Sequence, residues 1–297
     1  MTVAIAPEFA PRVRRDEPLS RHTSWHVGGP AEVLFNPKDR ADLEGFLKSL
    51  APQVPVSWMG LGSNLLVRDG GIQGVVISTH GTLDALTRLS ANQVAAGAGL
   101  ACARLARQCV KWGLGPAEFF AGIPGTLGGA LAMNAGAFGH ETWEAVASVE
   151  TIDRAGNVHV RARAEYQVSY RHVVAPQESE WFVSATLSFA ERAPAHTEEL
   201  QQLLERRRAT QPIGEWSCGS VFTNPKGDHA ARLIEAAGLK GHRIGDASVS
   251  LKHANFIINH GAASARDLES LIEHVRETVA RVHGITLTPE VRIVGHA

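Results

Sequence analysis

The chain has 297 residues, enough for two domains or for one domain carrying an insertion. Its 29 basic and 30 acidic side chains give a formal net charge of -1, so composition provides no general attraction to nucleic acid or to a membrane surface. No apolar run reaches the roughly 20 residues of a membrane-spanning helix, and the charges follow the first apolar patch, the wrong order for a secretory signal. We therefore expect a cytoplasmic protein without membrane insertion or nucleic-acid partners.

The three cysteines fit a reducing compartment. Cys102 and Cys109 recur at helical spacing with Leu105 and Trp112, so we expect them to face a core. Cys218 is isolated, and its neighbours in the sequence carry no base. Because the chain has no CxxC pair, the sequence predicts no metal site.

The first eighty residues predict a small α/β unit. Residues 41–50 place Leu43, Phe46, Leu47 and Leu50 on one face, which is typical of an amphipathic helix. Two short apolar runs, at 54–60 and 74–78, are predicted to form buried strands.

A second α/β unit is predicted next along the chain. A strand at 93–99 leads into a helix at 100–112. Residues 149–163 alternate about a glycine-containing turn, which indicates a β-hairpin. A strand at 181–189 closes this unit.

The last third of the chain predicts a region of different character. A charged helix at 196–212 ends at Pro212 and acts as a connector. Beyond it, the pattern predicts a helix at 229–238 and a strand at 254–259.

A long amphipathic helix follows in this region. Its apolar stripe extends from Leu268 to Val282, and Ser264 with Asp267 makes a capping box at its start. Gly284 marks its end. The chain closes with a strand-like segment at 287–295.

Two glycine-rich loops follow predicted strands, GLGSNLLV at 60–67 and GIPGTLGGALAMNAGAFG at 122–139. Glycine permits positive φ and lets backbone N–H groups approach a ligand, so such loops can surround phosphates without a positive side chain. Neither loop matches GxGxxG or GxxxxGK[ST], which argues against Rossmann and P-loop sites. One loop alone is equally well explained by a tight turn and close helix packing, but two favour a ligand with two phosphates.

Six motifs occur in the order in which one known family carries them. They are TSWHVGGPA (23–31), GLGSNLLV (60–67), AGIPGTLGGALAMNAGAFG (121–139), SYR (169–171), GSVFTNP (219–225) and PEVRIVG (289–295). With them the chain resembles, from about Ser20 to Gly295, the UDP-N-acetylenolpyruvoylglucosamine reductase family. Its only tyrosines are Tyr166 and Tyr170, so it is similar to the class that lacks a tyrosine loop over the substrate. Either glycine loop alone would indicate only the wider flavin family that includes vanillyl-alcohol oxidase.

The resemblance implies an α+β fold with three parts. Two α/β FAD-binding subdomains of the vanillyl-alcohol-oxidase type are expected at 1–80 and at 81–205, the second with the return of 286–297. A C-terminal α/β substrate-binding domain is expected at 206–285.

The resemblance also implies an enzyme that holds FAD noncovalently, takes hydride from NADPH and acts on a UDP-sugar. We expect it to be a monomer. The glycine loops would hold the FAD pyrophosphate through backbone amides. The residues expected to bind FAD are Gly60, Gly62, Ser63, Asn64, Leu65, Gly122, Pro124, Gly125, Thr126, Gly128, Gly129, Asn134 and Gly136.

In the family's reaction, hydride passes from NADPH through FAD to an enolpyruvyl double bond, giving UDP-N-acetylmuramate for peptidoglycan precursor synthesis. The chemistry needs a cation or acid at the substrate carboxylate and a proton for the carbon that becomes carbanionic. The resemblance assigns Arg171 to the carboxylate, Glu290 to the partner acid or hydrogen-bond donor, and Ser220 to the proton. Outside the motifs, these residues would be explained as a surface arginine, an edge-strand glutamate and a turn serine.

Further residues are expected to bind substrate. Asn224 matches an asparagine that contacts the nucleotide part, and Lys240, His253 and Asn255 lie where the family recognises the diphosphate and sugar. Arg292 follows Glu290 by two residues, which places both on one face of a strand. Solvated loop charges would give the same sequence pattern.

Two alternatives remain open. An FAD-dependent oxidase of the wider family, acting on an alcohol or sugar, would explain the first two hundred residues equally well, but not GSVFTNP and PEVRIVG. A noncatalytic nucleotide-binding protein of this fold would have no physical need for Arg171, Ser220 and Glu290 together.

Overall fold

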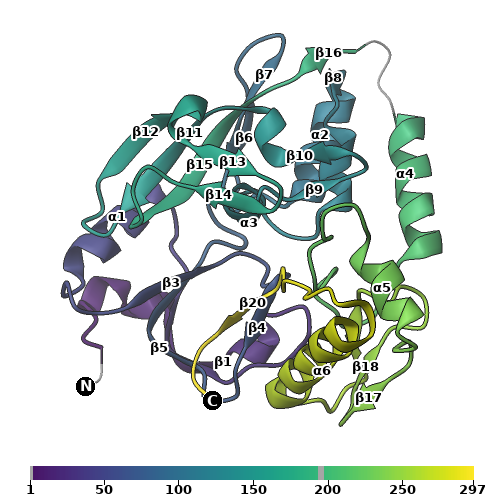
Figure 1. Ribbon diagram of the computed structural model, residues 1–297. Helices are drawn as coiled ribbons and strands as arrows, with labels where there is room; N and C mark the ends of the chain where they lie inside the picture. The colour runs from purple at the N-terminus through teal and green to yellow at the C-terminus, as the bar shows by residue number, and fades with distance from the viewer. Residues whose placement is uncertain (1–2, 193–196) are drawn as a thin grey trace. The chain divides into compact units, whose positions relative to one another are not determined.

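The computed structural model describes residues 3–192 and 197–297 (Figure 1). The chain divides into two compact units. The first unit comprises residues 1–14, 33–60 and 74–206, and the second comprises 15–32, 61–73 and 207–297.

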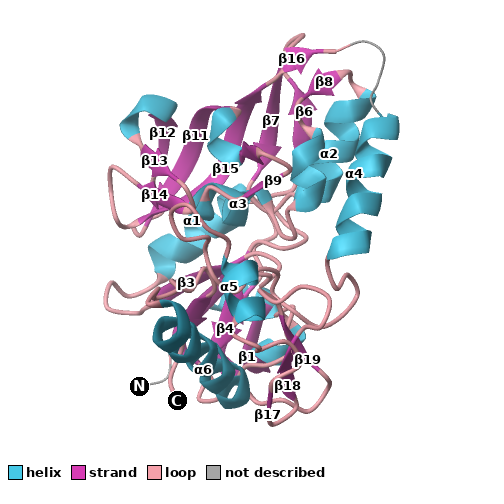
Figure 2. Ribbon diagram, turned by 45° about the vertical axis from the view of Figure 1, so that its right-hand side comes forward, coloured by secondary structure: helices cyan, strands magenta, loops and turns pink. Residues whose placement is uncertain are grey.

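Runs of consecutive strands are separated by helices along the chain (Figure 2). The α-helices are α1 (Arg40–Ser49), α2 (Cys102–Lys111), α3 (Leu127–Met133), α4 (Thr197–Thr210), α5 (Ala230–Ala236) and α6 (Ala265–His283). Short 3-10 helices are η1 (Pro7–Arg12), η2 (Leu19–Arg21), η3 (Glu118–Gly122), η4 (Thr142–Glu144) and η5 (Arg163–Glu165). The strands are β1 (Val13–Pro18), β2 (Pro30–Phe35), β3 (Val56–Met59), β4 (Leu65–Val67), β5 (Ile72–Ser78), β6 (Leu86–Arg88), β7 (Gln93–Gly97), β8 (Leu114–Gly115), β9 (Gly136–Ala137), β10 (His140–Glu141), β11 (Val146–Asp153), β12 (Val158–Ala162), β13 (Gln167–Ser169), β14 (His172–Val174), β15 (Glu180–Ser188), β16 (Ala190–Glu191), β17 (Arg243–Ile244), β18 (Ala247–Val249), β19 (Ile257–Asn259) and β20 (Arg292–Val294).

The helices and longer strands that the sequence predicts are present, and their ends lie within a few residues of the expected bounds. His196, the first residue of the predicted connector helix, lies outside the described residues. Strands β4, β13 and β14 have three residues each. Such strands are too short to show a hydrophobic period, so the sequence does not predict them.

The first unit contains an antiparallel five-stranded sheet in the order β12-β11-β15-β7-β6. Apolar side chains of α2 and α3 pack against strand residues such as Val94 and Leu187 in one core. Cys102 and Cys109 are fully buried in that core, which confirms the orientation predicted from their spacing.

A second sheet has the order β1-β2-β5-β3, with β3 and β5 parallel. Helix α1 begins where the Asp39 side chain accepts a hydrogen bond from Asp42 N, and it buries Phe46. The rings of Phe35 and Phe46 stack at 3.7 Å, with Phe9 edge-on to both. This aromatic cluster supplies much of the buried apolar surface under α1.

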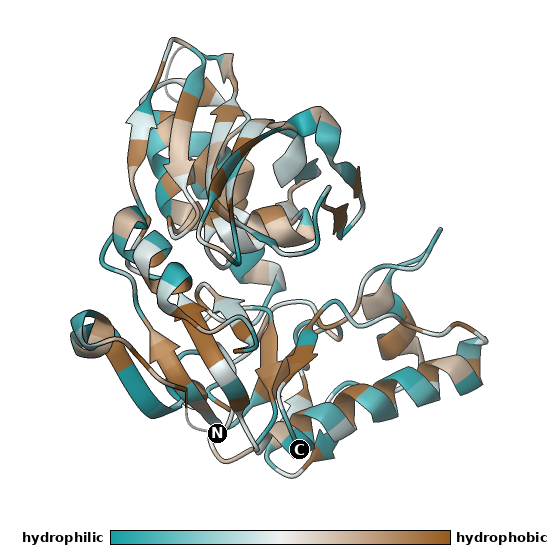
Figure 3. Ribbon diagram, turned by 90° about the vertical axis from the view of Figure 1, so that its left-hand side faces the viewer, coloured by the Kyte–Doolittle hydropathy of each residue, from teal (hydrophilic) through white to brown (hydrophobic). Residues whose placement is uncertain are grey.

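In the second unit, α6 covers the three-stranded sheet β17-β18-β19. Its capping box at Ser264 and Asp267 is formed, and Gly284 ends it at φ 67°, as predicted. Figure 3 shows hydrophobic and hydrophilic residues alternating along this helix. The predicted stripe is buried except for Val282, which is 48% exposed because it lies in the last turn, where the helix end reaches solvent.

The last strand, β20, pairs in parallel with β4, Arg292 opposite Leu65. Among the described strand pairs, the expected return of residues 286–297 to the segment 81–205 is therefore not seen. The three-part division of the chain otherwise stays a prediction.

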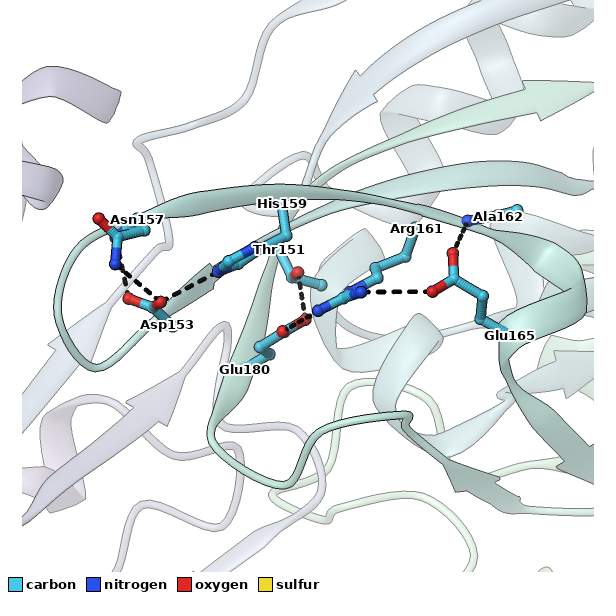
Figure 4. Close-up of polar contacts among 8 residues, drawn as sticks. All are labelled: Thr151, Asp153, Asn157, His159, Arg161, Ala162, Glu165 and Glu180. Carbon is cyan, nitrogen blue, oxygen red and sulfur yellow. Dashed lines mark hydrogen bonds and ion pairs between the residues drawn. The ribbon is translucent and has the colours of Figure 1, made fainter.

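The hairpin predicted at 149–163 is formed by β11 and β12. Asp153 accepts hydrogen bonds from Asn157 and from the ring of His159, and Glu180 of β15 accepts from Thr151 and Arg161 (Figure 4). A chain of polar contacts thus ties the hairpin to the neighbouring strand.

Candidate functional site

The two glycine loops meet within the first unit, at Gly60 and Thr126. A Cβ atom on Gly60 would overlap Thr126 Oγ1, so the loops can touch only because Gly60 has no side chain. Thr126 precedes α3 and also forms a bridge to Ala101. The structure therefore brings together these two parts of the predicted FAD-binding set.

Neighbouring glycines at the start of α3 have different environments. A Cβ on Gly128 would lie 3.0 Å from Ala98 Cβ, whereas a Cβ on Gly129 would have no neighbour nearer than Thr126 Oγ1 at 4.0 Å. Gly128 therefore allows the helix to pack against the end of β7, and Gly129 faces open space.

The first amides of α3 are already bonded within the protein. Leu127 N donates to Leu100 O and Gly128 N donates to Ala98 O, both at 2.8 Å. These two N–H groups are thus not the phosphate donors that a helix N-terminus commonly supplies. The open surface at Gly129 and the uncharged backbone around it still fit the pyrophosphate of a flavin dinucleotide.

The loop at 61–65 belongs to the second unit and packs against the TSWHVGGPA motif. Gly62 has φ 61°, and a Cβ there would overlap His22 O. The Asn64 side chain donates to Glu290 O at 3.0 Å, and Asn64 O accepts from Arg292 N at 3.0 Å. Asn64, expected to bind FAD, therefore also holds the segment that carries Glu290.

Arg171 lies in the two-residue turn between β13 and β14, at φ 55°. Left-handed conformations are uncommon outside glycine and cluster at functional sites. Its guanidinium donates to Asn134 O at 3.0 Å and to Gly136 O at 3.1 Å, and lies 3.5 Å from Glu141. The side chain is only 16% exposed, so Arg171 is not a freely solvated surface arginine.

Asn134 holds this arrangement. It ends α3 at φ 43°, and its side chain donates to Glu141 at 2.7 Å and to Ser169 O at 3.1 Å, while accepting from Trp143 N. Asn134 and Gly136, which sequence assigns to FAD, therefore surround Arg171. Sequence reasoning missed Glu141, because no motif marks a carboxylate seven residues beyond the helix end.

Ser220 and Glu290 occupy adjacent segments of the second unit. Gly219 turns the chain at φ 82°, and two residues later Val221 O accepts from Glu290 N at 2.7 Å. Phe222 and Pro289 continue this contact as an antiparallel bridge. The backbone thus places residues 70 positions apart on paired segments.

Cys218 is buried close to this pair. Burial raises the pKa of its thiol well above the ordinary value, and the charge of Glu290 raises it further. The thiol therefore stays protonated at neutral pH, which makes a nucleophilic role unfavourable.

The expected substrate-binding residues all lie in the second unit, and several have protein partners. Asn224 Oδ1 accepts from Ala230 N at the start of α5, and Lys240 Nζ lies 2.8 Å from Glu235. Burial lowers the pKa of His253, as does the nearby charge of Lys240. The remaining two are the exposed Arg292, which opposes Leu65, and Asn255, which pairs with the backbone after Ser220.

Within residues 3–192 and 197–297, no three His, Cys, Asp or Glu side chains are grouped so that they could hold a metal ion. In the same ranges, no helix combines the length and the apolarity that crossing a membrane requires.

Comparisons with known proteins agree with this geometry. Residues 31–161 match a domain described as "FAD binding domain", and this range includes Thr126 and the loop at 60–67. The fold and this match define the chain as an FAD-dependent oxidoreductase. Residues 211–294 match the domain "UDP-N-acetylenolpyruvoylglucosamine reductase, C-terminal domain".

Similar whole proteins point to the same family. The reductase of Alkalilimnicola ehrlichii is 60% identical over 96% of this chain and 95% of its own length, and that of Methylococcus capsulatus is 57% identical over 95% and 92%. The crystal structure of the reductase from Thermus caldophilus has a TM-score of 0.80 at 34% identity, covering 95% of this chain and 98% of that one. The chain belongs to the UDP-N-acetylenolpyruvoylglucosamine reductase family, and its cofactors are FAD and NADPH.

Proposed function

We propose that Arg171, Ser220 and Glu290 carry the chemical steps of this reductase. The reaction is reduction of UDP-N-acetylenolpyruvoylglucosamine to UDP-N-acetylmuramate, a step of peptidoglycan precursor synthesis. An oxidase acting on an alcohol or sugar is not favoured, because residues 211–294 match the reductase C-terminal domain. Bound FAD supplies the transfer of hydride from NADPH to the substrate.

Arg171 would bind the carboxylate of the enolpyruvyl group. A vinyl ether accepts hydride poorly unless its carboxylate is polarised, and a guanidinium can do this with two parallel hydrogen bonds. The carbonyls of Asn134 and Gly136 orient the guanidinium before substrate arrives. This preorganisation removes the reorganisation that a mobile arginine would need.

Ser220 would donate the proton that completes reduction, and Glu290 would act as the partner acid or hydrogen-bond donor at the developing enolate. A serine hydroxyl is a weak acid, but once hydride has reached one carbon of the double bond, the other carbon, next to the carboxylate, becomes enolate-like and strongly basic. The observation that carries this proposal is the bond from Glu290 N to Val221 O, which pairs the two segments.

Half-reactions separate these roles. Ser220→Ala removes a group needed only after hydride reaches the substrate, so NADPH should still bleach the FAD absorbance at close to the native rate. Reoxidation by UDP-N-acetylenolpyruvoylglucosamine should slow by roughly 10² to 10⁴-fold, the range for loss of a positioned general acid. Stopped-flow absorbance measures both steps.

Cys218→Ala is the matched control, two residues away and buried, and should leave both steps nearly unchanged. Equal slowing of both half-reactions by Ser220→Ala, or greater damage in the cysteine variant, would mean that the serine only maintains the loop.

The remaining site residues are proposed in the roles that the resemblance gives them. Asn224, Lys240, His253 and Arg292 would contact the UDP-sugar, and the glycine loops would hold FAD noncovalently. We also propose a cytoplasmic monomer. Three unpaired, buried cysteines support the reducing compartment.

A further inference from the structure

Asn255 makes three hydrogen bonds to the two residues that follow Ser220. Its side-chain Nδ2 donates to Phe222 O at 2.8 Å, and its Oδ1 accepts from Phe222 N at 3.0 Å. Its own carbonyl accepts from Val221 N at 2.9 Å. The side chain therefore pairs with Phe222 as a neighbouring strand would.

Only a side-chain amide can make this pairing. It offers a donor and an acceptor in one plane, whereas a carboxylate only accepts and an aliphatic chain does neither. Asn255 is 4% exposed, so water cannot easily replace either bond, and loss of one leaves a buried Phe222 group without its partner.

The segment that Asn255 holds is the one that pairs with Glu290. Val221 O accepts from Glu290 N at 2.7 Å, and Phe222 bridges to Pro289. Residues 221 and 222 therefore lie between Asn255 on one side and the Glu290 segment on the other. A shift of this segment would move Ser220 relative to Glu290.

We propose that Asn255 is a positioning residue for the proton-donating step, which sets the place of Ser220 beside Glu290. This inference rests on the role proposed for Ser220. It differs from the substrate contact expected from sequence, because both polar ends of the Asn255 side chain are engaged by Phe222. The amide acts on the reaction through the loop.

Asn255→Leu and Asn255→Asp test the inference in the FAD-loaded enzyme. Leucine removes both side-chain bonds at similar volume, and aspartate keeps the acceptor and loses the donor. Reduction of FAD by NADPH should stay within about twofold of native in both variants. Reoxidation at saturating substrate should slow by about tenfold or more in Asn255→Leu, which loses two buried hydrogen bonds, and by less in Asn255→Asp, which loses one. The substrate concentration at half-maximal reoxidation should change by less than about threefold, since both polar ends of the Asn255 side chain are engaged by Phe222.

A double variant asks whether Asn255 acts through Ser220. Ser220→Ala/Asn255→Leu should reoxidise no more than about twofold slower than Ser220→Ala alone, because the amide has nothing left to position. If the two effects multiply, Asn255 acts independently of the serine and the inference is wrong.

Asn259→Leu is the matched control. Asn259 lies four residues further on, is equally buried, and donates to Trp25 O at 2.8 Å while accepting from Gly261 N and Ala263 N. Its loss should lower the melting temperature without slowing reoxidation. If Asn255→Leu does not fold, Asn255→Asp is compared with Asn259→Asp in the same assays.

The remaining outcomes are distinguishable. The half-saturating substrate concentration could instead rise by tenfold or more while saturated reoxidation stays unchanged. That result would favour direct contact between Asn255 and substrate and would overturn the inference. Equal slowing by Asn255→Leu and Asn259→Leu would reduce Asn255 to a structural residue. A native rate of reoxidation in Ser220→Ala alone would instead overturn the proposed function.

Discussion

Two regions of the molecule keep their shape in opposite ways. One is the contact between the glycine loops at Gly60, Thr126 and Gly128, called here the glycine cradle. The other is the pair of segments that carry Ser220 and Glu290, called here the paired segments. In the cradle, backbones approach because side chains are missing, and an added Cβ would meet Thr126 or Ala98. At the paired segments, the amide of Asn255 is present and bonds the backbone. FAD binding in the cradle should therefore weaken when atoms are added, and reoxidation at the paired segments should slow when atoms are removed.

The comparison separates residues proposed to bind ligands from residues that hold the protein backbone. In the cradle, Gly128 packs on Ala98 while Gly129 faces open space, although both belong to the same run. At the paired segments, Ser220 would act on substrate while Asn255 is engaged by Phe222. Membership of a motif alone does not distinguish these roles.

Gly128→Val should have the largest effect on the cradle. Valine is compatible with the helical backbone, but its Cβ would start 3.0 Å from Ala98 Cβ and 3.1 Å from Ala98 O. Overpacking costs about 1–3 kcal/mol, so we expect FAD affinity to fall by up to about 100-fold if that strain displaces the cradle. The ratio of flavin to protein absorbance and a titration of the apoprotein with FAD measure it.

Gly129→Ala is the control for this change. The added methyl would meet only Thr126 Oγ1, at an unstrained 4.0 Å, and alanine favours a helix over glycine by about 1 kcal/mol. The apoprotein should therefore become slightly more stable. If FAD affinity nevertheless falls, the open space belongs to FAD; if Gly128→Val binds FAD normally, the cradle does not depend on missing side chains.

The sequence shows the glycine loops, whose role toward FAD stays a prediction, more plainly than the residues that hold the neighbouring backbone. Runs of glycine are visible in any sequence, and their physical meaning is narrow. The resemblance assigns Asn134 to FAD and Asn255 to substrate. An asparagine can bind a phosphate, a sugar or a backbone, and its type does not say which. The hairpin that places Arg171 has strands of three residues, too short to show a period.

Arg171→Lys tests a third region, the hairpin turn at Arg171, where backbone carbonyls hold the side chain. Like the paired segments, this region should lose function when hydrogen bonds are removed. Lysine keeps the charge but loses the planar fork that donates to Asn134 O and Gly136 O. Turnover should drop by at least about tenfold, or roughly 1.4 kcal/mol of transition-state stabilisation. Steady-state assays with NADPH and UDP-N-acetylenolpyruvoylglucosamine measure the loss.

Arg163→Lys is the comparison variant for the arginine. Arg163 also donates to two backbone carbonyls and stacks on Trp143, but it belongs to no motif. It should leave turnover nearly native. Full activity in the Arg171 variant would show that its charge alone suffices, or that it has no role.

Asp153→Asn should have the smallest effect and should leave both compared regions unchanged. Burial raises the pKa of Asp153, but hydrogen bonds from His159 and Asn157 outweigh it and lower the pKa to about 2 (Figure 4). Since the folded pKa is below the unfolded one, the ionised carboxylate contributes stability above about pH 4 that is lost as pH falls toward 2. After discounting for solvent, we expect Asp153→Asn to cost about 1 kcal/mol of unfolding free energy at pH 7.

The pH dependence makes this prediction specific. Urea unfolding should show the full difference between native and Asp153→Asn protein at pH 7 and a smaller one at pH 3, since Asp153 of the unfolded chain is largely protonated there while the folded carboxylate is still mostly ionised. Asp84→Asn, which breaks an ion pair with Arg104 at a more exposed site, should cost less at both values. Turnover should stay native in both variants, because this hairpin supports the sheet by contacts that touch neither Arg171 nor the glycine loops. An equal loss of stability at pH 7 and pH 3 would mean that shape, and not charge, gives Asp153 its effect.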